Sequence, residues 1–253
     1  MTTRRDAVTV LANGANQRAG MDFEHRICVN EYGFYCVPVE YDNREIPKLL
    51  ADGAVYEPGT LQLMRRRVSS GDIVTGGAFI GDFFPALCEA LDPDARVISF
   101  EPNPLSFAAA KQTIALNGLT NVTLHPVAVG EAAGQLPLQL SRKGGSASAA
   151  RARIVESGDE GETVNVDVVT LDSLVPADRQ VSILHLDVEG FEKPALLGAS
   201  RLIQDNAPMI VLEAEKRWQR NMYLDFLGEH FPALGYRFCG GMERNAFYLA
   251  QDR

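Results

Sequence analysis

From residue 72 onwards, short apolar runs alternate with stretches in which apolar side chains recur at helical spacing. This alternation is typical of a parallel sheet whose two faces are both covered by helices. The sequence therefore predicts an α/β fold in which the carboxyl ends of several strands meet at one edge of the sheet. The expected strands are 72–75, 96–102, 122–129, 165–174, 182–190 and 207–215, and an antiparallel hairpin, 236–240 and 245–250, is expected to close one sheet edge.

The first 55 residues do not follow this pattern. Residues 26–40 predict a short hairpin with Glu31, Tyr32 and Gly33 at its turn. We therefore expect residues 1–55 to form an N-terminal cap and residues 56–253 to form the main domain. The main domain begins with a helix near residues 59–68.

Residues 130–167 contain a long polar insertion with little that could anchor a hydrophobic core. Such a segment in a compact domain is usually a functional loop or disordered. We favour a functional loop that helps to shape the binding pocket.

The overall composition limits the class of partner and the compartment. A formal net charge of -9 argues against nucleic acid, because neutralising phosphates requires an excess of Lys and Arg. The four cysteines form no C-x-x-C pair, which favours reduced thiols and a cytoplasmic location. No stretch has the length and apolar character of a membrane span or of a signal peptide.

A glycine-rich turn, GGAFIG at residues 76–81, lies between the first predicted strand and the helix that follows it. Glycine allows the backbone to turn tightly there and leaves room for a nucleoside against the main chain. Glu101 ends the second strand, where nucleotide-binding folds place a carboxylate that accepts hydrogen bonds from ribose hydroxyls. Together the two features predict a cofactor that contains a nucleoside.

Two cofactors share this arrangement, a dinucleotide and S-adenosylmethionine, and Asp82 bears on the choice between them. A dinucleotide needs its pyrophosphate at the helix N-terminus, where a neighbouring carboxylate would oppose the charge. S-adenosylmethionine carries a sulfonium and an ammonium, which acidic neighbours favour. An ordinary helix N-cap is at least as good an interpretation of Asp82.

Three carboxylates, those of Asp187, Glu189 and Glu192, follow the fourth predicted strand. Ligands of doubly wound sheets bind outside the carboxyl ends of the strands, so reacting groups are expected here. We favour Asp187 as the base that accepts a proton from an acceptor hydroxyl, with His185 and Glu189 as alternatives. His185 also suits a buried, hydrogen-bonded core position, and the glutamates suit the N-terminus of a helix.

Six motifs between residues 55 and 215 resemble those of the FkbM family of methyltransferases. They are VYEPGT, GGAFIGDFFPAL, FEPNP, LNGLTNV, TLDSL and LHLDVEGFE, of which FEPNP and DVEGFE are the most discriminating. The resemblance implies a Rossmann-like class I methyltransferase fold, with a mostly parallel seven-stranded sheet and a C-terminal antiparallel hairpin. It also implies S-adenosylmethionine as the cofactor and O-methylation in natural-product or glycan tailoring.

The same resemblance assigns roles to individual residues. Gly77, Ala78, Phe79 and Gly81 would hold the methionine part of the cofactor, and Glu101 would hold the ribose. Glu57 would meet the amino group, although a place at a helix start suits it nearly as well. The expected cofactor-binding residues are Glu57, Thr60, Gly77, Ala78, Phe79, Ile80, Gly81, Asp82, Glu101, Pro102, Asn103 and Asp187; the expected catalytic residues are Asp187, His185 and Glu189; no metal is expected.

One position departs from the family pattern. The family commonly carries Asp, or sometimes His, at the end of the first strand, where this sequence has Thr75 followed by Gly76. Glu57 or Asp82 could replace the missing group, and reduced affinity for the cofactor is the other outcome.

Two alternatives therefore stay open beside an O-methyltransferase. An NAD(P)-dependent oxidoreductase would suit the glycine turn and Glu101, but no Tyr-x-x-x-Lys pair is evident. A catalytically weak S-adenosylmethionine-binding relative is the second. The expected acceptor is a small neutral or cationic molecule that is natural-product, sugar or peptide-derived, and homo-oligomerisation is left open.

Overall fold

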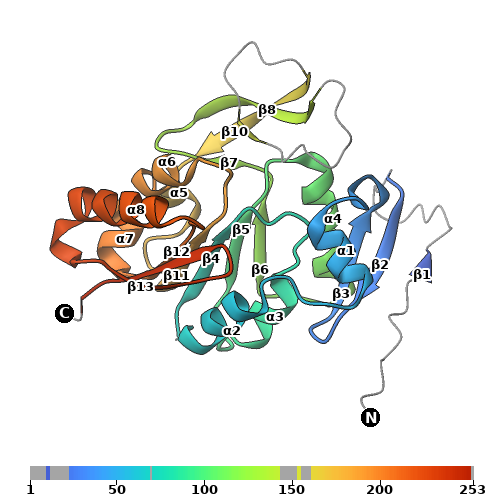
Figure 1. Cartoon of the computed structure of the whole chain (residues 1–253), viewed down its shortest axis with the longest axis horizontal. Helices are drawn as coiled ribbons and strands as arrows, with labels where there is room; N and C mark the ends of the chain where they lie inside the picture. Colours follow the sequence, from blue (N-terminus) through green and yellow to red (C-terminus); the bar gives the residue numbers. More distant parts are fainter. Residues whose placement is uncertain (1–9, 12–22, 69, 143–152, 155–160, 252–253) are drawn as a thin grey trace.

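The computed structural model describes residues 10–11, 23–68, 70–142, 153–154 and 161–251. Within them a seven-stranded sheet forms the centre of the molecule, in the order β6-β5-β4-β11-β12-β14-β13 (Figure 1). Neighbouring strands are parallel except where they pair with β14. The expected α/β fold with a large, mostly parallel sheet is confirmed. The strands are β4 (Asp72–Gly76), β5 (Val97–Phe100), β6 (Val122–His125), β11 (Val181–Leu186), β12 (Met209–Glu213), β13 (Arg237–Met242) and β14 (Asn245–Leu249).

Helices cover both faces of this sheet, which explains why its central strands are mostly apolar on both sides. Val74 and Leu184 pack into one hydrophobic cluster, whereas their neighbours Ile73 and Ile183 pack into another on the opposite face. Residues of α5–α8 complete the first cluster, and residues of α2–α4 the second. The helices are α2 (Pro58–Arg67), α3 (Phe84–Glu89), α4 (Pro104–Leu116), α5 (Leu171–Leu174), α6 (Glu192–Leu197), α7 (Ser200–Asn206) and α8 (Arg217–His230), which the short turn η2 (Pro232–Leu234) follows.

The pairing register aligns the carboxyl ends of four neighbouring strands. Gly76 at the end of β4 pairs with Leu186 of β11 on one side and with Phe100 of β5 on the other. Phe100 in turn pairs with His125 of β6. The residues that follow these strands therefore emerge together at one edge of the sheet.

The N-terminal segment contains the predicted hairpin, formed by β2 (His25–Val29) and β3 (Phe34–Pro38). The short strand β1 (Val10–Leu11) pairs with β2. β3 lies beside α4, where the Cys36 amide donates to the Thr113 hydroxyl oxygen at 3.1 Å. After β3 the chain forms a short turn, η1 (Val39–Tyr41), and then α1 (Glu45–Ala51). Within the part of the chain that the structure describes, no helix has both the length and the apolar character needed to cross a membrane.

The insertion after β6 differs from the sequence-based expectation. Residues 122–129 do not form one strand, because Pro126 follows β6 and cannot donate a ladder hydrogen bond. The chain then enters a separate sheet in the order β7-β10-β8-β9. Its strands are β7 (Ala128–Val129), β8 (Gly134–Arg142), β9 (Arg153–Ile154) and β10 (Gly161–Val169).

The described part of the predicted polar loop is therefore mainly an antiparallel ribbon, in which β8 pairs with β10. The expected strand 165–174 is shorter than predicted, because β10 ends at Val169 and residues 171–174 form α5. Leu138, Val166 and Val168 are buried on one side of the ribbon, and polar residues alternate with them. A sheet with one solvated face needs apolar residues at alternate positions only, so the segment lacks the continuous apolar runs of the central strands. The remainder of the predicted loop, 143–152 and 155–160, lies outside the described residues.

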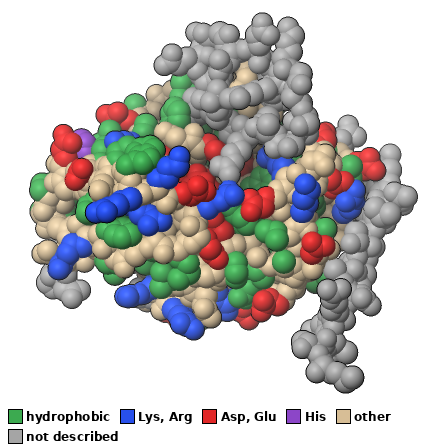
Figure 2. Space-filling view, viewed as in Figure 1, with side chains coloured by type: hydrophobic (Ala, Val, Ile, Leu, Met, Phe, Trp, Pro, Cys, Tyr) green, Lys and Arg blue, Asp and Glu red, His purple; other side chains and the backbone are tan. Residues whose placement is uncertain are grey.

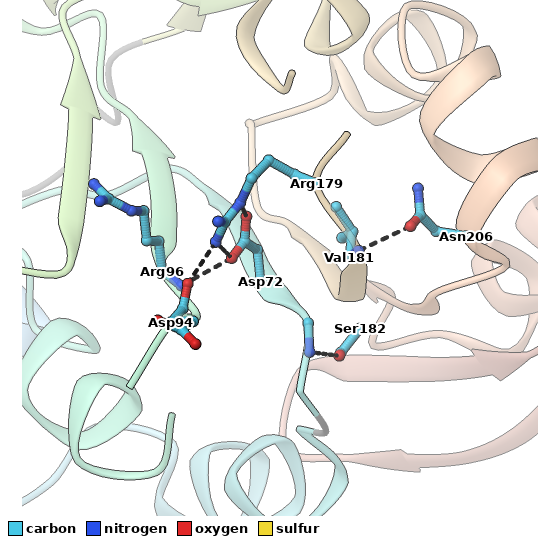
Figure 3. A network of polar contacts seen from close by, with 8 residues as sticks. Asp72, Asp94, Arg96, Arg179, Val181, Ser182 and Asn206 are labelled. Carbon is cyan, nitrogen blue, oxygen red and sulfur yellow. Dashed lines mark hydrogen bonds and ion pairs between the residues drawn. The ribbon is translucent and has the colours of Figure 1, made fainter. Parts of the chain in front are cut away.

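An ion pair with a buried carboxylate joins three segments at the amino ends of the parallel strands (Figure 3). The Asp72 carboxylate, at the start of β4, accepts hydrogen bonds from Arg179 Nε at 2.7 Å and from the Arg96 amide at 2.8 Å. Arg179 Nη2 contacts the same carboxylate and donates to the Asp94 carbonyl at 2.9 Å. Because the Asp72 side chain is only 1% exposed, these donors compensate for the loss of water around its charge.

We predict that Asp72→Asn lowers the free energy of unfolding by about 2–3 kcal/mol, because the new amide nitrogen would face the Arg179 guanidinium. Urea denaturation would measure the change. Asp205→Asn is the control, because Asp205 is 57% exposed in its pair with Arg201 and its loss should cost less than about 1 kcal/mol. Equal losses in the two variants would contradict the prediction.

Candidate active site

A cavity of about 600 Å³ opens at the carboxyl ends of β4, β5 and β11. Further segments that contribute to its walls include residues 43–48, residues 56–57 at the start of α2, the turn between β13 and β14, and the insertion sheet, through Ala128 and Val129 of β7 and Leu138 of β8. On the face drawn in Figure 2, Asp and Glu side chains lie next to Lys and Arg side chains, without a broad patch of either sign. The cavity lies where doubly wound sheets bind their ligands.

The glycine turn after β4 takes a backbone shape that needs glycine. Gly77 has φ +78°, and a Cβ at this position would lie 2.0 Å from the carbonyl oxygen of Asp187. The neighbouring Phe79 also adopts a positive φ of +46°, which is uncommon for a residue with a side chain. The turn is therefore held against the end of β11, and its backbone faces the cavity.

Glu101 holds this turn from the next strand. One carboxylate oxygen accepts from the Phe79 amide at 2.8 Å, and the other accepts from the Asn103 amide at 2.8 Å. Burial nevertheless raises the pKa of Glu101 to about 7. Each oxygen retains further acceptor capacity, so the carboxylate can bind a hydroxyl group in the cavity while it orders the turn.

Thr75 and His185 form a neutral polar pair at the ends of β4 and β11. The Thr75 hydroxyl oxygen lies 2.9 Å from His185 Nδ1, and the imidazole stacks on the Phe83 ring with centroids 5.6 Å apart. Burial lowers the pKa of His185 to about 4. Both side chains line the cavity. Thr75 thus stands where the family commonly has Asp or His, and it forms a hydrogen bond between two uncharged groups.

The acidic segment after β11 divides into two parts with different surroundings. Asp187 and Glu189 line the cavity, and Glu189 has φ +52°. Glu192 points elsewhere: its carboxylate accepts from the amides of Val188 at 3.1 Å and Gly190 at 3.2 Å. The same carboxylate accepts from the Tyr223 hydroxyl at 3.0 Å. Glu192 therefore shapes the loop that presents the other two carboxylates.

Glu57 and Asp82 add two partly buried carboxylates to the cavity wall. Burial raises the pKa of each to about 7. Asp82 is not the N-cap of α3, because Phe83 occupies that position and makes no side-chain cap bond. Tyr56 also lines the cavity, and burial together with the Glu57 charge raises the pKa of its hydroxyl.

Two aromatic contacts bring the N-terminal segment to the cavity. Tyr41 stacks on Phe79 with centroids 5.1 Å apart, and its hydroxyl lies 2.9 Å from the Ser106 hydroxyl oxygen. The Arg44 guanidinium lies 4.1 Å from the centroid of the Tyr41 ring and lines the cavity. Sequence reasoning did not find these residues, because no local pattern connects residues 41–44 with residue 79.

The structure brings most of the residues expected from the sequence into one lining. Those that line the cavity are Glu57, Gly77, Ala78, Phe79, Asp82, Glu101, Pro102, His185, Asp187 and Glu189.

Four expected cofactor-binding residues support the lining from behind. Thr60 is buried in the first turn of α2, Ile80 packs in the core beside α4, and Gly81 makes the turn into α3. Asn103 caps α4 by accepting from the amides of Leu105 and Ser106. Among the described residues, no group of three or more His, Cys, Asp or Glu side chains is arranged to hold a metal ion.

Comparison with solved structures supports the fold. The crystal structure of methyltransferase FkbM from Methylobacillus flagellatus KT has a TM-score of 0.50 and 15% identity, and the match covers 80% of this chain and 65% of that chain. Wild-type Trm5b from Pyrococcus abyssi has a TM-score of 0.48 and 11% identity, with 92% of this chain and 56% of that chain covered. The chain thus spans less than two thirds of the length of either protein, and at these identities the likeness concerns the fold alone.

Comparison of the sequence itself gives a more specific result. The search of curated proteins gives no match. The profile of the methyltransferase FkbM domain, in contrast, matches residues 76–238, from the glycine turn to β13. Because this match covers more than half of the 253 residues, the chain belongs to the FkbM methyltransferase domain family.

Proposed function

We propose that this chain is an S-adenosylmethionine-dependent methyltransferase that methylates an oxygen atom of a small-molecule acceptor. The observation that carries the proposal is the convergence of the Gly77 turn with the carboxylates of Glu57, Asp82 and Glu101 in a single cavity at the strand ends. The family match supports methyl transfer. The choice of oxygen and of a small acceptor is our inference from the site.

The charges of the lining fit S-adenosylmethionine better than a dinucleotide. Glu57, Asp82 and Glu101 would oppose a pyrophosphate and attract a sulfonium or an ammonium group. The cationic lining residues come from residues 43–48 and from the β13–β14 turn rather than from the glycine turn. A cavity of about 600 Å³ also falls within the usual range for small-molecule sites.

The cavity lining indicates which residues would hold the cofactor. The backbone of Gly77 and Ala78 would lie against its methionine part, and Glu101 would accept hydrogen bonds from the ribose. Glu57 and Asp82 would balance its positive charges. When bound, S-adenosylmethionine supplies an electrophilic methyl group, so the protein has chiefly to orient the acceptor and to exclude water.

Asp187 is the group that we assign to proton removal from the acceptor hydroxyl. It follows β11 directly, and its amide donates to the Gly76 carbonyl at 3.3 Å, so that its position is fixed by the sheet. The Asp187 carboxylate would accept the proton of the acceptor hydroxyl, which makes the acceptor oxygen a better nucleophile. Glu189 also lines the cavity, two residues further along the chain.

His185 is better suited to orientation than to proton transfer. Its pKa of about 4 makes the imidazole a weak base near neutral pH. The Thr75 hydroxyl and the Phe83 ring fix its plane. We therefore assign His185 to packing against the reacting groups. Because position 75 carries a threonine and not an acid, the neutral imidazole beside it leaves no unpaired charge at the ends of β4 and β11.

The acceptor is expected to be a small molecule rather than a nucleic acid. A formal net charge of -9 would repel a polyanion, and the face in Figure 2 has no broad basic patch. Sugar-like or other hydroxylated natural products are the class that we propose for testing.

We predict that S-adenosylmethionine binds to the purified protein in titration calorimetry and that NAD⁺ does not. Glu101→Gln should weaken binding by about tenfold, because its amide nitrogen would face either the Phe79 or the Asn103 amide and because it carries no charge. Glu229→Gln, an exposed change on α8, is the matched control. Tight NAD⁺ binding without S-adenosylmethionine binding would refute the proposed cofactor.

We further predict that affinity for S-adenosylmethionine rises by about tenfold between pH 6 and pH 8. Carboxyls whose pKa values are raised to about 7 ionise over this range, and only the ionised forms attract a cation. Calorimetry in buffers of different ionisation enthalpy should detect proton release on binding. Adenosine, which carries no charge, serves as the control and should bind with little pH dependence.

The same raised pKa values affect the ligand-free protein in the opposite direction. The folded state holds protons on these carboxyls that the unfolded state releases near its ordinary pKa of 4.5. Stability without ligand should therefore fall as pH rises from about 4.5 to 7. A binding affinity and a stability that were both flat over this range would contradict the assigned electrostatics.

For the base, we predict that Asp187→Asn lowers kcat by about a hundredfold at saturating S-adenosylmethionine. Transfer of a radiolabelled methyl group to a panel of sugars, phenols and hydroxy acids would first identify an accepted substrate. Glu189→Gln tests the neighbouring carboxylate in the same assay and should change kcat much less. An unchanged kcat in Asp187→Asn would remove this residue from the mechanism.

A further inference from the structure

Glu57 occupies the N-cap position of α2 but does not cap the helix. Its φ of +45° lies in the left-handed region, and its side chain makes no cap hydrogen bond. The carboxylate lines the cavity instead. Helices usually need an acceptor for their first free amides, so another group must serve α2.

That group is Glu243, which lies in the turn between β13 and β14. Its carboxylate accepts from the amides of Gly59 and Thr60, both at 3.0 Å, and from the Thr60 hydroxyl at 2.7 Å. A residue from the far end of the chain therefore replaces the local cap. This replacement leaves the Glu57 carboxylate available to the cavity.

Asn245, two residues later, connects the same turn to Glu57 directly. Its side-chain amide donates to Glu57 Oε2 at 2.6 Å and to the Thr60 hydroxyl oxygen at 3.3 Å. Asn245 is 2% exposed, so water cannot easily replace this donor. The Glu57 side chain is thus fixed by a hydrogen bond to its charged oxygen.

We propose that Asn245 is a positioning residue that holds the Glu57 carboxylate, ionised, at the cavity wall where it meets the positive charge of S-adenosylmethionine. This inference rests on the proposed function. It extends that function by giving the C-terminal hairpin, which does not itself need to touch the cofactor, a defined part in cofactor binding.

The groups around Glu57 act in different directions on its ionisation. Burial raises its pKa, and the Glu243 charge adds to this effect; the Asn245 amide, the Tyr56 hydroxyl and the Arg244 guanidinium oppose it. The Glu57 charge in turn raises the pKa of Asp82, which also lines the cavity. Of the three opposing groups, the Asn245 amide has the largest effect, so its removal should make Glu57 hold its proton to higher pH.

The first experiment follows the ionisation of Glu57 without any ligand. Carbon-detected NMR of side-chain carboxyls, with Glu57→Gln used for assignment, would give the titration midpoint of Glu57 in the wild-type protein and in Asn245→Ala. We expect the midpoint to rise by about one pH unit in Asn245→Ala. Thr60→Val is the structural control: it breaks the contacts of the Thr60 hydroxyl with Glu243 and Asn245, but leaves the bond to Glu57, and should not move the midpoint.

The second experiment is a double-mutant cycle on S-adenosylmethionine binding, measured by calorimetry. Asn245→Ala should weaken binding by about fivefold at pH 7, because about one tenth rather than one half of Glu57 is ionised. The loss should diminish at higher pH. In a Glu57→Gln background, Asn245→Ala should change the affinity by less than about twofold.

The outcomes separate the two proposals. An unchanged Glu57 midpoint in Asn245→Ala, or an equal loss of affinity in the Glu57→Gln background, would overturn the role of Asn245. If the wild-type protein bound no S-adenosylmethionine at any pH, the proposed function itself would fail, and the role of Asn245 in cofactor binding would fail with it. A partially unfolded variant would be recognised by its thermal denaturation, to which Thr60→Val provides the comparison.

Discussion

The carboxyl ends of β4 and β11 approach each other so closely that a side chain cannot fit between them at position 77. A Cβ on Gly77 would lie 2.0 Å from the carbonyl oxygen of Asp187, and the Asp187 amide donates to the Gly76 carbonyl. This one contact fixes both the glycine turn and the start of the acidic segment. It also determines where the Phe79 amide meets Glu101, so the other parts of the site depend on it.

The positions of the charged groups in the cavity follow from the free-energy cost of burying a charge at the strand ends. A hydrogen-bonded pair of neutral groups, Thr75 and His185, costs less to bury than an isolated charge. Negative charge is carried instead by Glu57, Asp82 and Glu101, whose pKa values burial raises to about 7. Such groups are poised to ionise when a cation arrives, which links cofactor binding to proton release.

Residues from both ends of the chain complete this wall. Glu243 caps α2, Asn245 binds Glu57, and Arg244 between them pairs with Glu45 of α1 at 2.9 Å. The β13–β14 hairpin is therefore more than the last element of the sheet. It joins the start of α2 to α1 of the N-terminal segment. These contacts at the cavity wall are made between residues that lie far apart in the sequence.

The sequence by itself determined the α/β class, the central strands, and the two motifs at the strand ends, because apolar periodicity and glycine turns are local properties. It also determined that Glu101 and Asp187 lie at the same end of the sheet, since parallel strands end at a common edge. Only the tertiary structure decided that β8 and β10 form a ribbon, that Arg44 reaches the cavity beside Tyr41, and that Glu243 rather than Glu57 caps α2. Those features arise from hydrogen bonds and packing between residues far apart in the chain, and such contacts leave no periodic pattern along it.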